Sequence, residues 1–149
     1  MFTEEEIKFF LDEAFKEARI SYSKDEVPVG AVVVKDKKIV GRGHNLREEK
    51  KEIHSHAEIE AIIDAEKKLN TWKLDDCTLF VTLEPCFMCT GAISQSNIKS
   101  VYFACLDEQE GCILSKNINS NKNLPFLAYY CPQKEASEIL KKFFQNKRK

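Results

Sequence analysis

Residues 79–89 read Leu-Phe-Val-Thr-Leu-Glu-Pro-Cys-Phe-Met-Cys and carry the clearest structural signal in the chain. The run 77–82 alternates and ends apolar, which predicts a β-strand, and the composition of 87–96 suits a helix. Between them, Pro85 is typical of the first turn of a helix, because its missing N–H would have no helical partner there. A buried strand that leads directly into a helix is a basic unit of α/β folds.

The segments on either side of this unit continue the alternation of helices and strands. Thr3 and Glu6 match a capping box at the start of an amphipathic helix over 4–20. The other patterns predict strands at 29–34, 39–43, 101–105 and 127–131, helices at 56–69 and 135–145, and irregular polar stretches at 44–55 and 107–126. This order predicts a three-layer α/β/α fold with a central mixed sheet.

Composition limits the classes of protein to which the chain can belong. Its 149 residues fit one domain, 1–149, and a hydrophobic content of 43% is enough for a core. The net charge of −1 excludes a surface that binds nucleic acid all over, so any such contact must be local. The acidic start, 1–6, lacks the features of a signal peptide, and no apolar run reaches the roughly 18 residues of a membrane span. We therefore expect a cytoplasmic protein whose six cysteines are metal ligands or buried thiols.

Cys86 and Cys89 are spaced to bind one metal ion. On the first turn of a helix, positions three apart share a face, and the helix N-terminus favours thiolates. His56 can add an imidazole, which gives the ligand set of a catalytic zinc site with a fourth position open to water. A redox pair and a structural zinc site with a fourth protein ligand are the alternatives. The candidates for that fourth ligand are Cys77, Cys105, Cys112, Cys131, His44 and His54.

Glu58 favours the catalytic alternative, because a carboxylate beside a metal-bound water can accept a proton and pass it on. The segments His56-Ala57-Glu58 and Pro85-Cys86-Phe87-Met88-Cys89 match the signature of zinc-dependent base deaminases. In that signature the glutamate is the general acid and base and is not a metal ligand. The role of Glu58 comes from the signature, since spacing alone does not place its side chain.

The sequence resembles the bacterial tRNA adenosine deaminases over nearly its whole length. The segments that carry the resemblance are 26–31 (Glu-Val-Pro-Val-Gly-Ala), 43–48 (Gly-His-Asn-Leu-Arg-Glu), 56–62 (His-Ala-Glu-Ile-Glu-Ala-Ile), 79–93 and Phe143-Phe144. The resemblance implies a cytidine-deaminase-like fold with a five-stranded sheet, a homodimer, and one zinc ion per subunit held by His56, Cys86 and Cys89. It also implies hydrolysis of adenosine to inosine at the wobble position of a tRNA anticodon, with arginine tRNA carrying ACG as the expected substrate and Glu58 as the proton shuttle.

The same resemblance implies substrate contacts for five residues. The backbone N–H of Ala57 and the side chain of Asn45 would recognise the base. Asp107 would lie near the RNA backbone and ribose, and Phe143 and Phe144 near the anticodon loop. Without the resemblance, Asn45 is equally well a turn residue, Asp107 an ordinary loop aspartate, and the aromatic pair part of the core.

Several positions depart from the family pattern. Residues 52–55 read Glu-Ile-His-Ser where an Asp-Pro-like turn is usual, Phe87 replaces a small residue or proline, and Gln109 replaces a frequent lysine. We interpret His54 as an exposed loop residue. These differences bear on RNA affinity and loop geometry and leave the chemistry unchanged.

Two other functions are compatible with the metal-ligand spacing. A deaminase of free bases or nucleosides would share the signature, although the Asn45 segment and the aromatic and basic C-terminus favour tRNA. A non-catalytic zinc-binding module would have no need of Glu58. The basic residues Lys141, Lys142 and 147–149 either contact RNA phosphates or form a solvated helix end.

Overall fold

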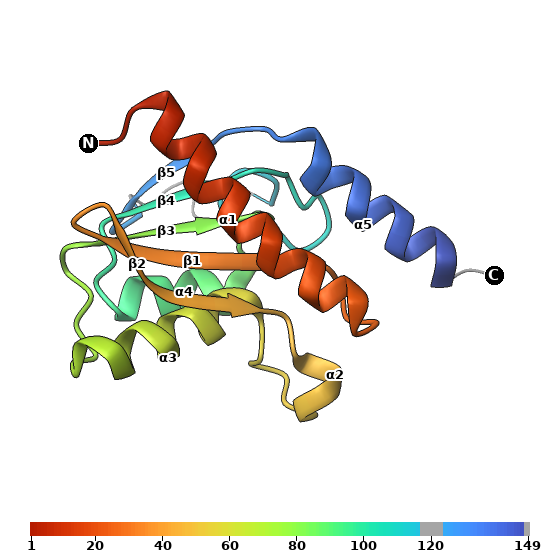
Figure 1. The fold of residues 1–149 in the computed structure, drawn as a ribbon, viewed down its shortest axis with the longest axis horizontal. Helices are drawn as coiled ribbons and strands as arrows, with labels where there is room; N and C mark the ends of the chain where they lie inside the picture. Colours follow the sequence, from red (N-terminus) through yellow and green to blue (C-terminus); the bar gives the residue numbers. More distant parts are fainter. Residues whose placement is uncertain (117–123, 148–149) are drawn as a thin grey trace.

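The computed structural model describes residues 1–116 and 124–147 (Figure 1). Its helices are α1 (Glu4–Ser23), α2 (Arg47–Lys50), α3 (Ala57–Leu69), α4 (Phe87–Gln95) and α5 (Lys134–Lys147). Its strands are β1 (Gly30–Lys35), β2 (Lys38–His44), β3 (Cys77–Val81), β4 (Ser100–Phe103) and β5 (Leu127–Tyr130).

The strands form one mixed sheet in the order β2-β1-β3-β4-β5. Strand β1 runs antiparallel to β2 and β3, whereas β3, β4 and β5 are parallel to one another. The prediction of a five-stranded mixed sheet flanked by helices is therefore confirmed. Because β3 and β4 are parallel, the chain must cross over between them, and α4 makes that crossing.

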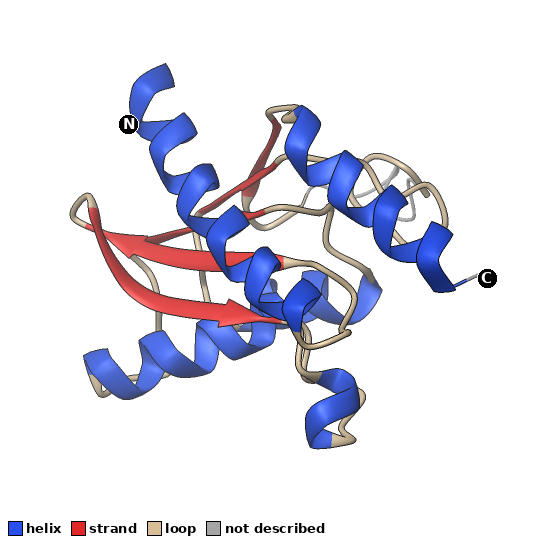
Figure 2. Ribbon diagram, turned by 45° about the vertical axis from the view of Figure 1, so that its right-hand side comes forward, coloured by secondary structure: helices blue, strands red, loops and turns tan. Residues whose placement is uncertain are grey.

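Helices cover both faces of the sheet (Figures 1 and 2). On β1, Val32 and Val34 pack with Phe10 and Leu11 of α1. The alternate residues Ala31 and Val33 belong to a second cluster on the other face, which includes Ala57, Ala61 and Ala65 of α3 and Ile93 of α4. A strand buried on both faces explains why 29–34 is apolar throughout.

Two glycines let the helices lie directly on the backbone of the sheet. A Cβ atom at Gly30 would overlap the carbonyl oxygen of Ala14 in α1, and one at Gly43 would overlap the backbone nitrogen of Ala61 in α3. These contacts hold α1 and α3 close to the end of β2, where the chain leaves the sheet towards α2.

The predicted elements are confirmed to within a few residues, with one exception. The stretch 44–55, expected to be irregular, contains the short helix α2. The carboxylate of Glu26 accepts hydrogen bonds from the backbone N–H groups of Glu48 (3.0 Å) and Glu49 (2.7 Å), so this helix start is held by a distant residue. In contrast, the capping box of Thr3 and Glu6 is present as predicted.

The second predicted irregular stretch, 107–126, is only partly described. Residues 107–116 form turns, whereas Asn117, Asn119, Asn121 and Asn123 lie outside the described residues. Among the described helices, none combines the length and the apolar character that a membrane crossing requires.

Candidate active site

Two helix starts meet at the predicted metal site. His56 is the N-cap residue of α3 and Cys86 that of α4, and both have an extended backbone. Neither side chain caps its own helix within the described residues. Cys89, in the first turn of α4, is completely buried below them. The three side chains are thus directed towards one another by the starts of their helices.

The distances among these side chains fit a tetrahedral metal ion. The Nδ1 atom of His56 lies 3.7 Å from Sγ of Cys86 and 3.5 Å from Sγ of Cys89. All three donor atoms lie within 4.8 Å of one another. Tetrahedral zinc with ordinary bond lengths would separate an imidazole nitrogen from a thiolate sulfur by about 3.6 Å. The group His56, Cys86 and Cys89 therefore suits a metal of this kind without rearrangement.

The protonation of the two thiols is uneven. The pKa of Cys86 is lowered to about 4, chiefly because the Cys89 thiol donates a hydrogen bond to it and also because His56 lies close. The pKa of Cys89 is raised, since its proton is held by Cys86 and its sulfur is buried. A divalent cation bound by these two residues would replace the thiol protons, because a sulfur ligand must be deprotonated.

Glu58 lies beside this group on the first turn of α3. Only 4% of the residue is exposed, and its side chain lines the same cavity. Burial is the main reason why its pKa is raised to about 7. A carboxyl group with such a pKa can both take up and release a proton near neutral pH.

A cavity of about 930 Å³ opens above these residues. Parts of the chain that are far apart in sequence line it: Asp25, Glu26, Val27, Val29, Asn45, Arg47, Glu48, Ile53, His56, Ala57, Glu58, Leu83, Glu84, Cys86, Phe87, Met88, Asp107, Glu110, Phe143, Phe144 and Lys147. The cavity therefore brings together every predicted site residue except Cys89, which is completely buried.

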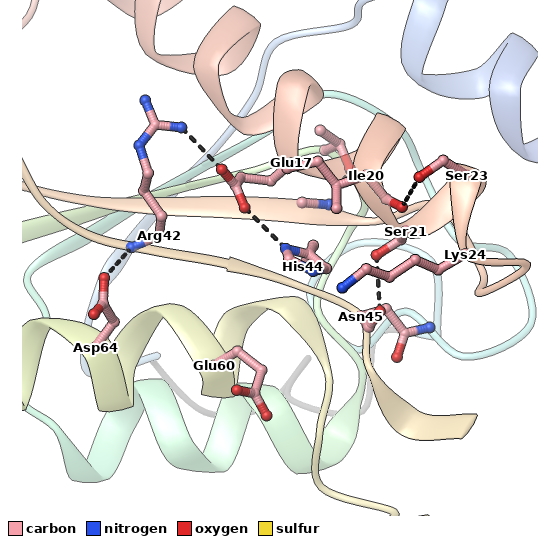
Figure 3. Close-up of polar contacts among 12 residues, drawn as sticks. Glu17, Ile20, Ser21, Ser23, Lys24, Arg42, His44, Asn45, Glu60 and Asp64 are labelled. Atoms are coloured by element: carbon pink, nitrogen blue, oxygen red, sulfur yellow. Dashed lines mark hydrogen bonds and ion pairs between the residues drawn. The ribbon is translucent and has the colours of Figure 1, made fainter. Parts of the chain in front are cut away.

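Asn45 is both a turn residue and a cavity residue. Its Oδ1 accepts from the N–H of Arg47 (3.1 Å), and its Nδ2 donates to the carbonyl of Val27 (3.2 Å). Helix α1 supports it from behind, because the Ser21 hydroxyl donates to the Asn45 carbonyl at 2.8 Å (Figure 3). Among the described residues, one N–H and one lone pair of the amide have no partner and could bind a ligand.

The preceding residue is anchored to the same helix. The Nδ1 atom of His44 lies 2.9 Å from Oε1 of Glu17, and the guanidinium of Arg42 pairs with the other oxygen of that carboxylate at 3.0 Å (Figure 3). Helix α1 thus fixes the end of β2, and with it the position of Asn45.

Ala57 is the first residue of α3, so its N–H has no partner within the helix. It lies between His56 and Glu58 and lines the cavity. The structure thus places this backbone donor and Asn45 in the lining of the same cavity.

Asp107 is held in a turn at the edge of the cavity. Its Oδ1 accepts from the N–H groups of Gln109 (3.2 Å) and Glu110 (3.1 Å), which leaves Oδ2 for other contacts. Its own N–H donates to Glu84 at 3.1 Å. Gln109 is exposed and is not among the described residues that line the cavity.

The two C-terminal phenylalanines differ in exposure. Phe143 is 7% exposed and packs edge-on against Tyr22, whereas Phe144 is 47% exposed at the mouth of the cavity. Lys147 pairs with Asp25 at 2.6 Å and so joins the end of α5 to the end of α1. The remaining basic residues of the tail are Lys141 and Lys142, which are exposed, and Arg148 and Lys149, which lie outside the described residues.

His54 is exposed, as expected, and pairs with Glu52 at 2.9 Å. Among the described residues it is not part of the cavity lining. Phe87, the bulky substitution within the signature, lines the cavity and is 67% exposed.

Sequence patterns missed two buried acids of the site, Glu26 and Glu84. Both line the cavity. Glu26 accepts backbone N–H groups from the start of α2, and Glu84 accepts them from residues 107–115. For Glu84, burial opposes ionisation, but the Ser115 hydroxyl and several N–H groups outweigh burial and lower its pKa. An acid shortly before a proline, as in Glu26-Val27-Pro28 and Glu84-Pro85, is the one local signal that could have revealed them.

Comparison with known proteins places the chain in a family. A family model described as MafB19-like deaminase matches residues 6–148. A tRNA-specific adenosine deaminase of Aquifex aeolicus is 43% identical over 144 residues, which cover 95% of both chains. The chain belongs to the tRNA-specific adenosine deaminase family. A further tRNA-specific adenosine deaminase, from Bacillus subtilis, is 46% identical over 70% of this chain and 65% of its own length.

Solved structures agree with this family. One from a study of adenosine-to-inosine editing by tRNA deaminases at the wobble position has a TM-score of 0.82 at 34% identity, and the match covers 89% of this chain and 99% of that one. A guanine deaminase of Bacillus subtilis has a TM-score of 0.64 at 36% identity, covering 70% of this chain and 66% of that one. The predicted family and its cytidine-deaminase-like fold are confirmed, and a relative with a different substrate shares the fold.

Proposed function

We propose that this protein hydrolyses adenosine to inosine and ammonia at the wobble position of a tRNA anticodon. The observation that carries the proposal is a buried glutamate beside a His/Cys/Cys group, in a chain that matches a tRNA-specific adenosine deaminase over 95% of both lengths. The metal is proposed to be zinc, one ion per subunit, bound by His56, Cys86 and Cys89.

Bound to these three residues, zinc would supply a Lewis acid that lowers the pKa of water. Glu58 would take one proton from water and deliver it to the ring nitrogen beside the reacting carbon. It would then take the proton of the hydroxyl group added to that carbon and deliver it to the amino group, which departs as ammonia when the C–N bond breaks. The carboxyl returns to its starting state once ammonia leaves, so atoms and charge balance. Its burial keeps bulk water away from the proton while it is transferred.

The proposed base contacts use groups that the fold leaves available. The free N–H and lone pair of Asn45 and the N–H of Ala57 could pair with the edge of a base turned out of the anticodon loop. Asp107 would contact the ribose and backbone, and Phe144 would stack beside a neighbouring base. Phe143, being buried, would support Phe144 instead of contacting RNA directly.

The proposed setting is a homodimer in the cytoplasm, with residues 1–149 as a single domain. The large apolar side chains Ile53 and Phe87 are highly exposed beside the cavity, which supports a partner surface there. The expected substrate is the anticodon stem-loop of arginine tRNA with ACG.

The direct test is incubation of the purified protein with that tRNA and, separately, with free guanine, adenosine and cytidine. Inosine at the wobble position, and none in a matched tRNA with guanosine there, is the expected result. The specific rival is a free-base deaminase, which the likeness to guanine deaminase favours. Ammonia release from a free base, without inosine in the tRNA, would establish that rival.

A further inference from the structure

Glu84 accepts five hydrogen bonds, all of them from residues 107–115, a segment called here the 107–115 loop. Oε1 accepts from the N–H of Asp107 (3.1 Å) and the hydroxyl of Ser115 (2.5 Å). Oε2 accepts from the N–H groups of Ile113 (3.0 Å), Leu114 (2.7 Å) and Ser115 (2.9 Å). The residue is 2% exposed, so these donors replace water around the carboxylate.

The same loop is joined to the metal-binding turn. The N–H of Cys112 donates to the carbonyl of Pro85 at 3.0 Å, and Gly111 forms an antiparallel bridge with Cys86. Glu84 immediately precedes these two residues, and its own N–H donates to the carbonyl of Cys105 at 2.8 Å. Residues 84–86 therefore bind the 107–115 loop and also provide Cys86, a residue of the proposed metal site.

The 107–115 loop packs tightly against the carboxyl group of Glu84. A Cβ atom at Gly111 would overlap the carboxyl group of Glu84, so backbone and carboxylate are in direct contact there. Asp107, at the start of the loop, lines the cavity. Its turn is held in place by the hydrogen bond from its N–H to Glu84. Moving Glu84 would therefore move the cavity edge that carries Asp107.

We propose that Glu84 is a positioning residue that fixes the 107–115 loop, and with it Asp107, against Cys86, so that the cavity accepts a nucleotide within RNA. The proposal rests on the proposed function for its substrate. Its physical basis is that a carboxylate can satisfy five donors, whereas a neutral amide of the same size has one oxygen and would turn an NH₂ group towards N–H donors. Substituting Glu84 by glutamine should therefore release part of the loop while leaving the metal ligands in place.

The test compares Glu84→Gln with Glu108→Gln, the same chemical change at an exposed position of the same loop. The measurements are KM and kcat on the anticodon stem-loop, bound zinc, and amide hydrogen exchange. We expect Glu84→Gln to keep its zinc, to lose protection at the amides of 113–115, and to raise KM about tenfold while kcat changes less than about threefold. Glu108→Gln should behave as the unsubstituted protein.

Three outcomes would overturn the proposal: amides of 113–115 that stay protected, a KM that stays constant although they exchange, or a loss of kcat in proportion to zinc. If Glu84→Gln does not fold, Ser115→Ala removes one of the five donors and should raise KM about threefold, and an unchanged KM would contradict the proposal. If the unsubstituted protein converts no RNA, the proposed function fails. The exchange of the 113–115 amides then still decides whether Glu84 holds the loop.

Discussion

Two parts of the cavity are built differently. The cleft floor, made of His56, Glu58, Cys86 and Cys89, lies at the N-caps and in the first turns of α3 and α4. The cleft rim, made of Asn45, Asp107 and Phe144, lies on two loops and the C-terminal helix. Residues of the floor are placed by the helix in which they stand, whereas Asn45 and Asp107 are placed by contacts with residues distant in sequence.

Because of this difference, substitutions in the cleft floor and in the cleft rim should have different effects on activity. A change in the floor should remove chemistry and leave the loops in place. A change in the rim, or in the acids that support it, should weaken the binding of RNA and leave the chemistry at saturation nearly intact. Substitutions in the two parts can test this separation.

The largest effect is expected from Cys89→Ala, which removes a completely buried residue of the proposed metal site. Because two remaining ligands bind zinc much more weakly than three, bound zinc and turnover should both fall to background. Metal content by mass spectrometry and inosine formation measure the two effects. Cys131→Ala is the matched control, and an active Cys89→Ala protein would contradict the assignment of the ligands.

Glu58→Gln should lower kcat by about a thousandfold, since a positioned general acid and base contributes roughly 10²–10⁴ to a rate. Zinc content, melting temperature and RNA affinity should stay unchanged because the amide has the same shape. The measurement is single-turnover formation of inosine, with Glu66→Gln on the same helix as the control. A rate within a few fold of that control would remove Glu58 from the mechanism.

Glu26→Gln should act on the rim. Two N–H groups of α2 lose a charged acceptor, so α2 should fray and Arg47 and Glu48 should move at the cavity edge. We expect kcat/KM on the anticodon stem-loop to fall about tenfold, mostly through KM. Steady-state kinetics test this against Glu49→Gln, an exposed neighbour on the same helix. A fall in kcat alone would mean that α2 supports the floor.

The smallest effect on RNA binding, about fivefold, is expected from Phe144→Ala, because loss of a base-stacking contact on a partly exposed ring should cost about 1 kcal/mol, the lower end of the range for such contacts. Its stability should change little. Phe143→Ala should instead lower the free energy of unfolding by about 3 kcal/mol, as for other buried phenylalanines. Urea unfolding and RNA titration of both variants distinguish the roles, and equal effects on both quantities would show that the pair acts as one unit.

The same division explains what could be predicted from the sequence. The strands and the long helices follow from local periodicity, and the pairing of Cys86 with Cys89 follows from residues three apart on a helix. His56 and Glu58 follow from the match to the deaminase signature. Helix α2 could not be predicted, because its start is held by Glu26, which lies more than 20 residues earlier. The five bonds of Glu84 likewise join distant residues, so neither periodicity nor composition indicates them.

The aromatic pair shows a further limit. Adjacent positions 143 and 144 have the same residue type, yet one is buried and the other exposed. Their difference arises from the contact of α5 with Tyr22 of α1, which no local pattern encodes. The residues proposed to contact RNA are thus the ones whose placement needs the structure.

The close approach of α1 and α3 to the sheet has a consequence for how this protein could change over time. At Gly30 and Gly43 even one added methyl group would strike a helix backbone, so no conservative replacement exists there. The two positions can change only together with a shift of a whole helix, which would displace Asn45 or His56. In directed evolution towards another substrate, we therefore expect single substitutions to be tolerated in the cleft rim. We do not expect them at Gly30 or Gly43.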